Sequence, residues 1–439
     1  MSQVLLRGRT LSFLRMPESA TDAAAFDYNE DGAVLVEAGK IVASGAYEST
    51  LAKAAPGVEV VDHRPHLILP GLIDCHAHYP QMQIIASYGA ELLDWLNTYT
   101  FPEETKFANP QHSRRIARLF LDELIRHGTT SVVAYCSVHK SSAEAFFAES
   151  DSRNMLNVAG KVMMDRNAPN GLLDTPQSSY DDTKALIAAW HGKGRQHYAV
   201  TPRFAITSSP EQMEMAGALM REHPELHMQT HLSENQAEIA FACELYPQAK
   251  DYTDIYAHYG LIGPRALFGH SIHLSDRELD ALSDSRSVGV FCPTSNLFLG
   301  SGLFPYQRNR KRAKALRIAT ATDVGGGTSY SMLRTMDEAY KIIALQGEKL
   351  NPFAAFWQIT RGNAEALSLE SRIGTLEAGS DADLVVMNAA ATPGMSLRME
   401  RVTNLAEELF LLQTLGDDRA VAEVYIAGRP AKSEMQTGS

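Results

Sequence analysis

Two histidines stand at the end of an apolar run near residue 70. His76 and His78 are two residues apart in ILPGLIDCHAH. In a β-strand, residues i and i+2 point to the same face, so both imidazoles can reach one metal ion. The spacing alone is weak, because the chain has 15 histidines and most of them need no function. The pair gains meaning only if other parts of the chain supply further ligands.

Three further apolar runs end on a side chain that can bind a metal. His231 closes MQTH, His270 closes LFGH and Asp323 closes ATATD. Barrel enzymes place their active sites at the C-terminal ends of their strands. The alternative is a set of hydrogen-bonded core histidines and a helix-capping aspartate, which would need a separate explanation at each position. The convergence therefore predicts a metal site.

Histidines combined with a carboxylate favour a borderline ion such as zinc or iron. Magnesium prefers oxygen ligands alone, and we expect zinc. Three nitrogens and one carboxylate leave a position for water, whose pKa zinc brings down toward 7, so that hydroxide is available at neutral pH. The residue types therefore predict metal-assisted hydrolysis.

The elements that hold these residues alternate between helix and strand. Residues 113–128 carry apolar side chains at helical spacing and end on a glycine, and TTSVVAYC then has the pattern of a buried strand. Eight strands of this kind are expected, at residues 67–76, 129–136, 157–164, 197–204, 226–231, 266–271, 287–292 and 317–323. Each is followed by a helix, which favours an α/β fold with a TIM-like (β/α)8 barrel. An open doubly wound sheet is the alternative.

Both ends of the chain have a different texture. Short apolar runs in the first 70 residues are separated by turn residues such as Asp31-Gly32 and Gly39-Lys40, and short strands return after about residue 370. We expect residues 1–69 and 374–439 to build one small flanking β-sandwich beside a barrel of residues 70–373.

Composition excludes several classes of protein. The 439 residues are 45% apolar and carry a formal net charge of −12, which suits a soluble globular protein and makes nucleic acid a poor partner. The four cysteines show no paired spacing, as expected in a reducing cytosol. There is no signal-peptide pattern and no uninterrupted apolar stretch of about 18 residues, so a cytoplasmic protein that neither crosses nor binds a membrane is expected.

PGLIDCHAHYPQ and GTLEAGSDADLVVMN resemble the opening and closing signatures of the amidohydrolase superfamily. The resemblance covers nearly the whole chain and implies a (β/α)8 barrel with a flanking β-sandwich. Two-metal members carry a bridging carboxylated lysine at the end of the fourth strand. Arg203 takes that place here, and Lys161 lies inside the third expected strand. The resemblance therefore implies one zinc ion per chain, with the ligands His76, His78, His231 and Asp323.

More narrowly, four stretches resemble the superfamily members that hydrolyse guanine to xanthine and ammonia. They are residues 79–104, 201–207, 228–235 and 322–333. This resemblance implies purine catabolism and a homodimer. It gives catalytic roles to Asp323, to His270, which orients or polarises the attacking water, and to Glu234 as the proton shuttle. For Glu234 the alternative is an exposed glutamate that opens the next helix, where acidic residues are common.

Substrate recognition is expected from Gln81 and Arg203. A forked guanidinium together with a side-chain amide can match the carbonyl and ring nitrogens on the edge of guanine. Adenine would turn an amino donor toward Arg203 and leave the guanidinium unsatisfied. Trp95 and Phe204 could enclose the ring, although plain core packing explains both equally well. The full expected substrate set is His78, Tyr79, Pro80, Gln81, Trp95, Arg203, Phe204, His231, Glu234 and Asp323.

Two other functions are considered. The same mechanism could act on another nitrogen heterocycle, such as 8-oxoguanine, cytosine or a triazine, and a panel of bases would discriminate. A catalytically silent scaffold on this fold is the alternative from a different class. The retained ligands and Glu234 argue against a scaffold, because a scaffold does not need them.

Overall fold

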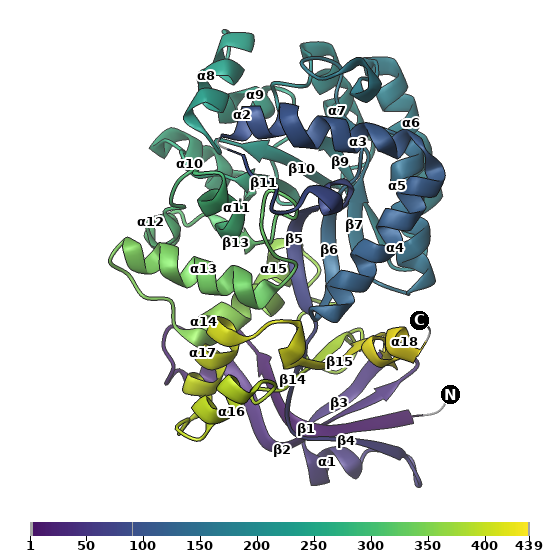
Figure 1. The fold of residues 1–439 in the computed structure, drawn as a ribbon, viewed down its shortest axis with the longest axis vertical. Helices are drawn as coiled ribbons and strands as arrows, with labels where there is room; N and C mark the ends of the chain where they lie inside the picture. Colours follow the sequence, from purple (N-terminus) through teal and green to yellow (C-terminus); the bar gives the residue numbers. More distant parts are fainter. Residues whose placement is uncertain (1–2, 90, 438–439) are drawn as a thin grey trace.

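The computed structural model describes residues 3–89 and 91–437. It consists of a barrel, in the upper part of Figure 1, and a sheet built from both ends of the chain, in the lower part. Within the described residues, eight parallel strands follow one another around the barrel in sequence order, and a ninth short strand, β8 (Val162–Met163), pairs with β9. The eight are β5 (Leu72–His78), β6 (Thr129–Tyr135), β7 (Asn157–Gly160), β9 (Gln196–Pro202), β10 (His227–Leu232), β11 (Ala266–His270), β12 (Val288–Phe291) and β13 (Arg317–Thr320). The expected (β/α)8 barrel is confirmed.

The barrel closes between its last strand and its first. The N–H of Asp323 donates to the carbonyl of His76 at 2.9 Å, and the N–H of Thr322 donates to Asp74 Oδ1 at 3.0 Å. Closure therefore joins two of the expected metal ligands directly. The fold itself therefore holds His76 and Asp323 next to each other.

Helices cover the outside of the barrel. The longest is α4 (Pro110–Arg126), which begins at the N-cap Asn109 and buries an apolar stripe that includes Phe120 and Leu124. A capped helix with one apolar stripe is the element predicted for residues 113–128. The other helices between or after barrel strands are α5 (Lys140–Ser152), α6 (Pro176–Trp190), α7 (Pro210–Glu222), α8 (Gln236–Leu245), α9 (Tyr252–His258), α10 (Asp276–Asp284), α11 (Pro293–Phe298), α12 (Tyr306–Lys311), α13 (Met332–Leu345), α14 (Pro352–Trp357) and α15 (Asn363–Ala366).

The connection after β5 is longer than the others. Its short helical turns are η2 (Tyr79–Ile84), α2 (Leu92–Trp95), η3 (Leu96–Thr100), α3 (Phe101–Thr105) and η4 (Lys106–Ala108). In Figure 1, α2 and α3 cross the upper end of the barrel, above the ends of the strands. This segment supplies one wall of the pocket described below.

Both ends of the chain build the second sheet. In the described residues its strand order is β16-β15-β14-β4-β1-β2-β3, which confirms the flanking β structure and shows it as one continuous sheet. Its strands are β1 (Gln3–Phe13), β2 (Phe26–Glu37), β3 (Lys40–Ala46), β4 (Glu59–Pro70), β14 (Leu384–Met387), β15 (Val421–Ile426) and β16 (Arg429–Pro430). Helix α1 (Tyr47–Leu51) packs against Leu5 and Leu35, while α16 (Pro393–Met399), α17 (Leu405–Leu415) and α18 (Lys432–Thr437) belong to the C-terminal part.

The first expected strand, residues 67–76, is divided between the two sheets. Leu67–Pro70 pair with β14, and the barrel strand starts only at Leu72. Gly71 lies at the change of sheet, where a Cβ would stand 2.1 Å from the Thr130 side chain. A continuous apolar run cannot reveal this division, because both halves are fully buried.

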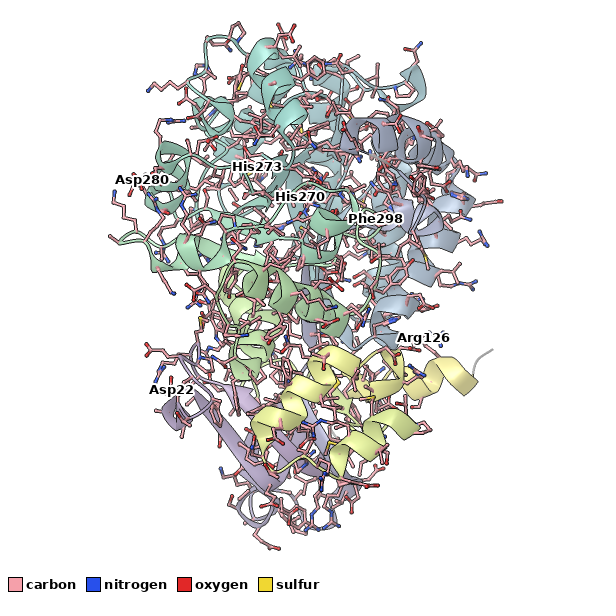
Figure 2. All side chains as sticks on the ribbon, turned by 60° about the vertical axis from the view of Figure 1, so that its left-hand side comes forward. Asp22, Arg126, His270, His273, Asp280 and Phe298 are labelled. Carbon is pink, nitrogen blue, oxygen red and sulfur yellow. The ribbon has the colours of Figure 1, made fainter. Side chains whose placement is uncertain are left out.

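A cluster of paired charges joins the barrel to the terminal sheet. We call Lys40, Arg195, Arg372, Asp381 and Asp383 the junction cluster. Arg195 binds Asp383 and lies 3.0 Å from Asp381, which also pairs with Lys40 and Arg372. Figure 2 shows that His270 lies well away from the terminal sheet, within the body of the barrel. The junction cluster is therefore separate from the expected metal site.

Two absences concern the described residues. None of their helices is both long and apolar enough to cross a lipid bilayer. All four cysteines are free thiols, and three of them are buried.

Candidate active site

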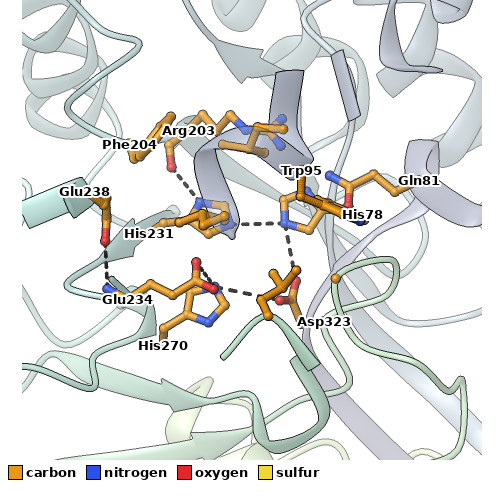
Figure 3. A pocket seen from close by; sticks show the side chains of 14 residues that line it. His78, Gln81, Trp95, Arg203, Phe204, His231, Glu234, Glu238, His270 and Asp323 are labelled. Carbon is orange, nitrogen blue, oxygen red and sulfur yellow. Dashed lines mark hydrogen bonds and ion pairs between the residues drawn. The ribbon is translucent and has the colours of Figure 1, made fainter. Parts of the chain in front are cut away.

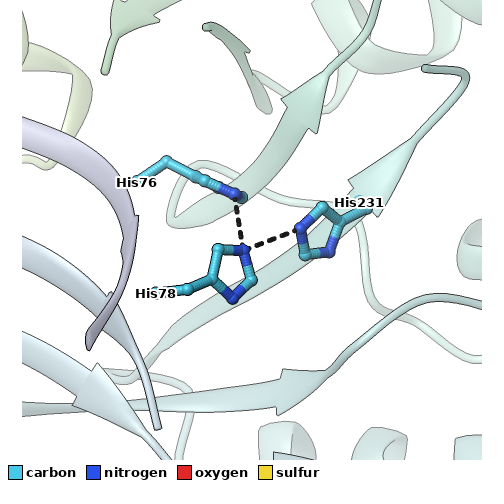
Figure 4. Close-up of side chains that lie close together, drawn as sticks. All are labelled: His76, His78 and His231. Carbon is cyan, nitrogen blue, oxygen red and sulfur yellow. Dashed lines mark hydrogen bonds between the residues drawn. The ribbon is translucent and has the colours of Figure 1, made fainter. Parts of the chain in front are cut away.

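Three histidine nitrogens converge at the mouth of the barrel (Figure 4). The Nε2 atom of His78 lies 3.2 Å from Nε2 of His76 and 3.1 Å from Nε2 of His231. Oδ1 of Asp323 is 3.2 Å from His76 Nε2 and 3.6 Å from His78 Nε2. Alternation along β5 turns His76 and His78 inward, and β10 supplies His231 from across the barrel. His76 therefore belongs to two overlapping groups of possible ligands, one with His78 and His231 and one with His270 and Asp323.

The chemistry of this cluster fits a divalent cation. The Nδ1–H of His231 donates to the carbonyl of Arg203 at 2.7 Å, which leaves its Nε2 with a lone pair directed at the other rings. Nδ1 of His78 is buried and has no partner among the described residues. Burial lowers the pKa of His76, His78 and His231, which favours the neutral form of the ring that binds a metal. Converging lone pairs beside a carboxylate make a candidate His/Asp metal site.

Two residues of this site adopt backbone conformations that residues other than glycine usually avoid. His270 has φ +66° and Asp323 has φ +53°, in the left-handed region that costs non-glycine residues free energy. Gly269 precedes His270, and a Cβ there would lie 2.7 Å from Cε1 of His76. The close approach of β11 to the His76 ring therefore requires glycine. Such strain is typical of functional sites.

Glu234 and His270 form a second buried pair beside the ligands. Nε2 of His270 is 3.2 Å from Oε2 of Glu234 and 3.7 Å from Oδ2 of Asp323. Its Nδ1–H donates to Asn296 Oδ1 at 3.0 Å. Glu234 also accepts a hydrogen bond from the Ser301 hydroxyl at 2.8 Å. At 2% exposure, Glu234 is not the solvent-exposed residue of the alternative interpretation.

Electrostatics prepare these groups for proton transfer. Burial raises the pKa of Glu234, and the nearby His270 only partly opposes this. Burial acts to lower the pKa of His270, but Glu234 and Asp323 outweigh it and raise that pKa. Burial acts to raise the pKa of Asp323, but His76 and His270 outweigh it and hold that pKa below its ordinary value. The site therefore shifts the pKa values of its two carboxyl groups in opposite directions.

A pocket opens beside the cluster. Figure 3 shows Arg203, Trp95 and Gln81 on one side of it and Glu234, His270 and Asp323 on the other. Of the expected residues, the pocket is lined by His78, Gln81, Trp95, Arg203, Phe204, His231, Glu234, His270 and Asp323. A planar base between two such walls would meet hydrogen-bond donors at one edge and the metal site at the other.

Arg203 differs from its expected state. Its charge is balanced within the chain, because its Nη1 donates to both oxygens of Glu104, at 2.9 and 2.8 Å. Glu104 Oε1 also accepts from Nε2 of Gln81 at 2.9 Å. The expectation that adenine would leave the guanidinium of Arg203 unsatisfied is therefore wrong in one respect, because Glu104 already compensates its charge. Sequence reasoning missed Glu104, although it belongs to the FPEE stretch that carried the resemblance.

Two members of the expected substrate set do not line the pocket. Tyr79 points the other way, with its hydroxyl on the Ser142 carbonyl at 2.8 Å and its ring against Phe107. Pro80 follows it in η2 and also lies outside the lining. Strand β5 ends at His78, and Tyr79 is already the first residue of η2. Lys161 is likewise turned away, since its ammonium pairs with Asp174.

Several lining residues have no signal in the sequence. Leu92, Leu96, Leu299, Glu238 and Gly326 complete the wall. Leu92 and Leu96 are four residues apart on consecutive helical turns, so their spacing predicts a shared face but not what that face covers. Glu238 accepts from the backbone N–H groups of Glu234 and Asn235, at 2.8 and 3.0 Å, and so holds the start of α8 in place.

Comparison with known proteins identifies relatives of this chain. Residues 67–431 match the Amidohydrolase family. Guanine deaminase of Escherichia coli (strain K12) is 44% identical over 427 residues, which are 97% of this chain and 96% of that protein. A solved structure of E. coli guanine deaminase has a TM-score of 0.95 at 43% identity, covering 98% of this chain and 99% of that one.

A guanine deaminase from C. acetobutylicum, solved with bound guanine in the active site, has a TM-score of 0.87 at 29% identity and covers 98% of this chain and 100% of its own. Both the family match and the 44% identity span most of this chain. The chain therefore belongs to the amidohydrolase family and, within it, to the guanine deaminases.

Proposed function

We propose that this chain hydrolyses guanine to xanthine and ammonia. The observation that carries the proposal is a single pocket with a His/Asp cluster and Glu234 at one side and the donors of Arg203 and Gln81 at the other. The names of the relatives support it, because guanine deaminase of E. coli is 44% identical over nearly the whole chain. The C. acetobutylicum relative is described with guanine in its active site.

We propose one zinc ion per chain, held by His76, His78, His231 and Asp323. Histidine nitrogen with one carboxylate is a donor set that suits zinc. When bound, zinc supplies Lewis acidity that lets water attack at neutral pH. Lys161 does not offer a bridge to a second ion, because its ammonium is engaged by Asp174 and the Val162 carbonyl.

Glu234 is proposed to move the proton. It lies between the ligand cluster and the pocket, takes a proton from the attacking water, and passes it to a ring nitrogen and then to the departing amine. Ser301 and His270 hold its two oxygens in place. His270 orients the water from the side of Asp323, whose second oxygen it approaches at 3.7 Å. The sum of these steps consumes one water and releases one ammonia.

Recognition is proposed to come from donors at the opposite wall. N–H groups of Arg203 and Gln81 meet the carbonyl oxygen and ring nitrogen acceptors on the edge of guanine. Trp95 and Phe204 hold the faces of the ring, and Leu92 and Leu299 exclude water around it. Adenine places an amino donor where guanine has its carbonyl, so it matches these donors poorly.

Kinship and composition support further proposals. We propose a cytoplasmic enzyme of purine catabolism that works as a homodimer. We also propose the division into a barrel of residues 70–373 and a flanking β domain of residues 1–69 and 374–439.

Incubation of the purified, metal-loaded protein with guanine tests the reaction. We expect loss of the guanine ultraviolet band with xanthine and ammonia appearing in equal amounts. The absence of turnover by a protein that is folded and contains its metal would refute the proposal.

A further inference from the structure

Glu104 is a fully buried carboxylate behind the recognition wall. It lies on α3, is 0% exposed and does not line the pocket. Its two oxygens accept from Nη1 of Arg203 and from Nε2 of Gln81. These partners come from separate parts of the chain, since Gln81 lies in η2 and Arg203 follows β9. One carboxylate therefore holds both recognition residues.

The hydrogen bonds of Glu104 determine what the wall offers a ligand. Gln81 must turn its NH2 toward the carboxylate, and its Oε1 faces the N–H of Gly325 at 3.4 Å. The second N–H of that amide and the remaining N–H groups of Arg203 are then the groups left for a ligand. The wall presents donors, which suits a base edge that carries acceptors.

The charge of Glu104 matters as much as its geometry. A guanidinium without a carboxylate partner in a buried wall would attract any anion that fits the pocket. Glu104 cancels that charge, while Glu234 and Asp323 face the opposite side of the same pocket. A negatively charged base then gains no net attraction from Arg203.

We infer that Glu104 is a positioning residue for specificity, because it makes the recognition wall neutral and donor-only, so that neutral guanine is preferred over anionic purines. The inference rests on the proposed function. Its consequence concerns the product, since xanthine has an N–H between two carbonyl groups and is more acidic than guanine. The neutral wall prevents the xanthine anion from being retained after the reaction.

Binding of two bases without an exocyclic amine tests the inference. Calorimetry measures the affinity for xanthine, at a pH where xanthine is largely ionised, and the affinity for neutral hypoxanthine. The quantity compared between variants is the ratio of the xanthine affinity to the hypoxanthine affinity. Glu104→Gln keeps the size of the side chain and removes its charge, and should raise this ratio at least about tenfold. Its KM for guanine should also rise more than its kcat falls, as expected when ground-state positioning is lost.

Glu103→Gln is the matched control. Glu103 neighbours Glu104 on α3, is 5% exposed and pairs with Lys106 at 2.6 Å, outside the pocket. The ratio in this variant should stay at the wild-type value. An unchanged ratio in folded, metal-loaded Glu104→Gln, or an equal change in Glu103→Gln, would overturn the inference.

Arg203→Gln decides the matter if Glu104→Gln does not fold. It leaves the Glu104 carboxylate without its cation, so the ratio should fall at least about tenfold, the opposite direction. A ratio that does not fall would overturn the inference. Because binding is measured without turnover, a wild type that binds both bases but does not deaminate guanine would contradict the proposed reaction and not the role of Glu104.

Discussion

Two buried polar clusters in this molecule are built on opposite rules. In the junction cluster, every carboxylate has a cationic partner: Arg195 reaches Asp381 and Asp383, and Lys40 and Arg372 add to Asp381. In the active-site cluster, which is His76, His78 and His231, imidazole nitrogens face one another. The Nε2 atom of His78 lies within 3.2 Å of Nε2 of both other rings.

The junction cluster consists of charges that stabilise the fold, whereas the second cluster consists of groups suited to bind a ligand. Both carboxylates of the junction cluster are balanced by cations of the chain itself. Three converging imidazole nitrogens are not satisfied by one another, and His270 and Asp323 also keep left-handed backbone. Such an arrangement persists because the surrounding barrel enforces it. Disturbing the first cluster should therefore change stability, and disturbing the second should change chemistry.

Metal removal should give the largest effect. Chelation is expected to abolish guanine turnover and to lower Tm, because an ion that binds only the folded state stabilises it. About one equivalent of zinc should restore both, as measured by elemental analysis alongside the assay. Two metals per chain in the active preparation, or full activity after complete removal, would contradict the single metal site.

Replacing Glu234 should come next. Glu234→Gln keeps size and burial but cannot carry the proton, so kcat should fall roughly a hundredfold or more while the metal stays bound. Glu244→Gln, on the exposed side of α8, is the control and should behave as wild type. A Glu234→Gln enzyme near the wild-type rate would show that another group moves the proton.

The junction cluster should give the reverse pattern. Arg195→Met leaves Asp381 and Asp383 buried without their main cation, which should cost about 3–5 kcal/mol of unfolding free energy in urea titrations. Turnover of guanine by the folded variant should remain near the wild-type rate. Normal stability, or a selective loss of turnover, would mean that the two clusters are not distinct in role.

Acidification should give the smallest effect. Burial acts to raise the pKa of Asp381, but Arg195, Lys40 and Arg372 hold it below its ordinary value of 3.8. Its contribution to stability is therefore present above the unfolded-state pKa of about 3.9 and is lost as the pH falls through the folded-state pKa. Tm is measured from neutral pH downward. Below the unfolded-state pKa, the Tm of Asp381→Asn should fall less steeply with decreasing pH than the Tm of wild type. If Tm fell equally steeply with pH in both proteins, the ionisation of Asp381 would not contribute to stability.

The sequence predicts the barrel, and that these side chains come together, for one physical reason. Each of His231, His270 and Asp323 ends an apolar run, and the ends of parallel strands meet at one face of a barrel. His76 and His78 add the two-residue spacing of a strand. Local patterns are enough where the fold itself gathers the ends of the strands.

Other parts of the site depend on contacts between distant segments. Glu104 sits on a short helix and meets Arg203, 99 residues away in sequence, and no periodicity distinguishes it from the acids of a solvated helix face. The division of the first expected strand at Gly71 depends on Thr130, a residue of the neighbouring strand. The expected substrate set includes Tyr79, whereas in the structure the side chain of Tyr79 packs on Phe107.

A panel of bases tests the central claim most directly. Turnover of guanine, adenine and cytosine is measured for wild type, Arg203→Ala and Gln81→Ala, with metal content recorded for each. The account predicts that wild type deaminates guanine and leaves adenine and cytosine essentially untouched. It also predicts that Arg203→Ala loses well over tenfold in kcat/KM for guanine while keeping its metal. Adenine or cytosine processed as fast as guanine, or unchanged guanine kinetics in Arg203→Ala, would contradict it.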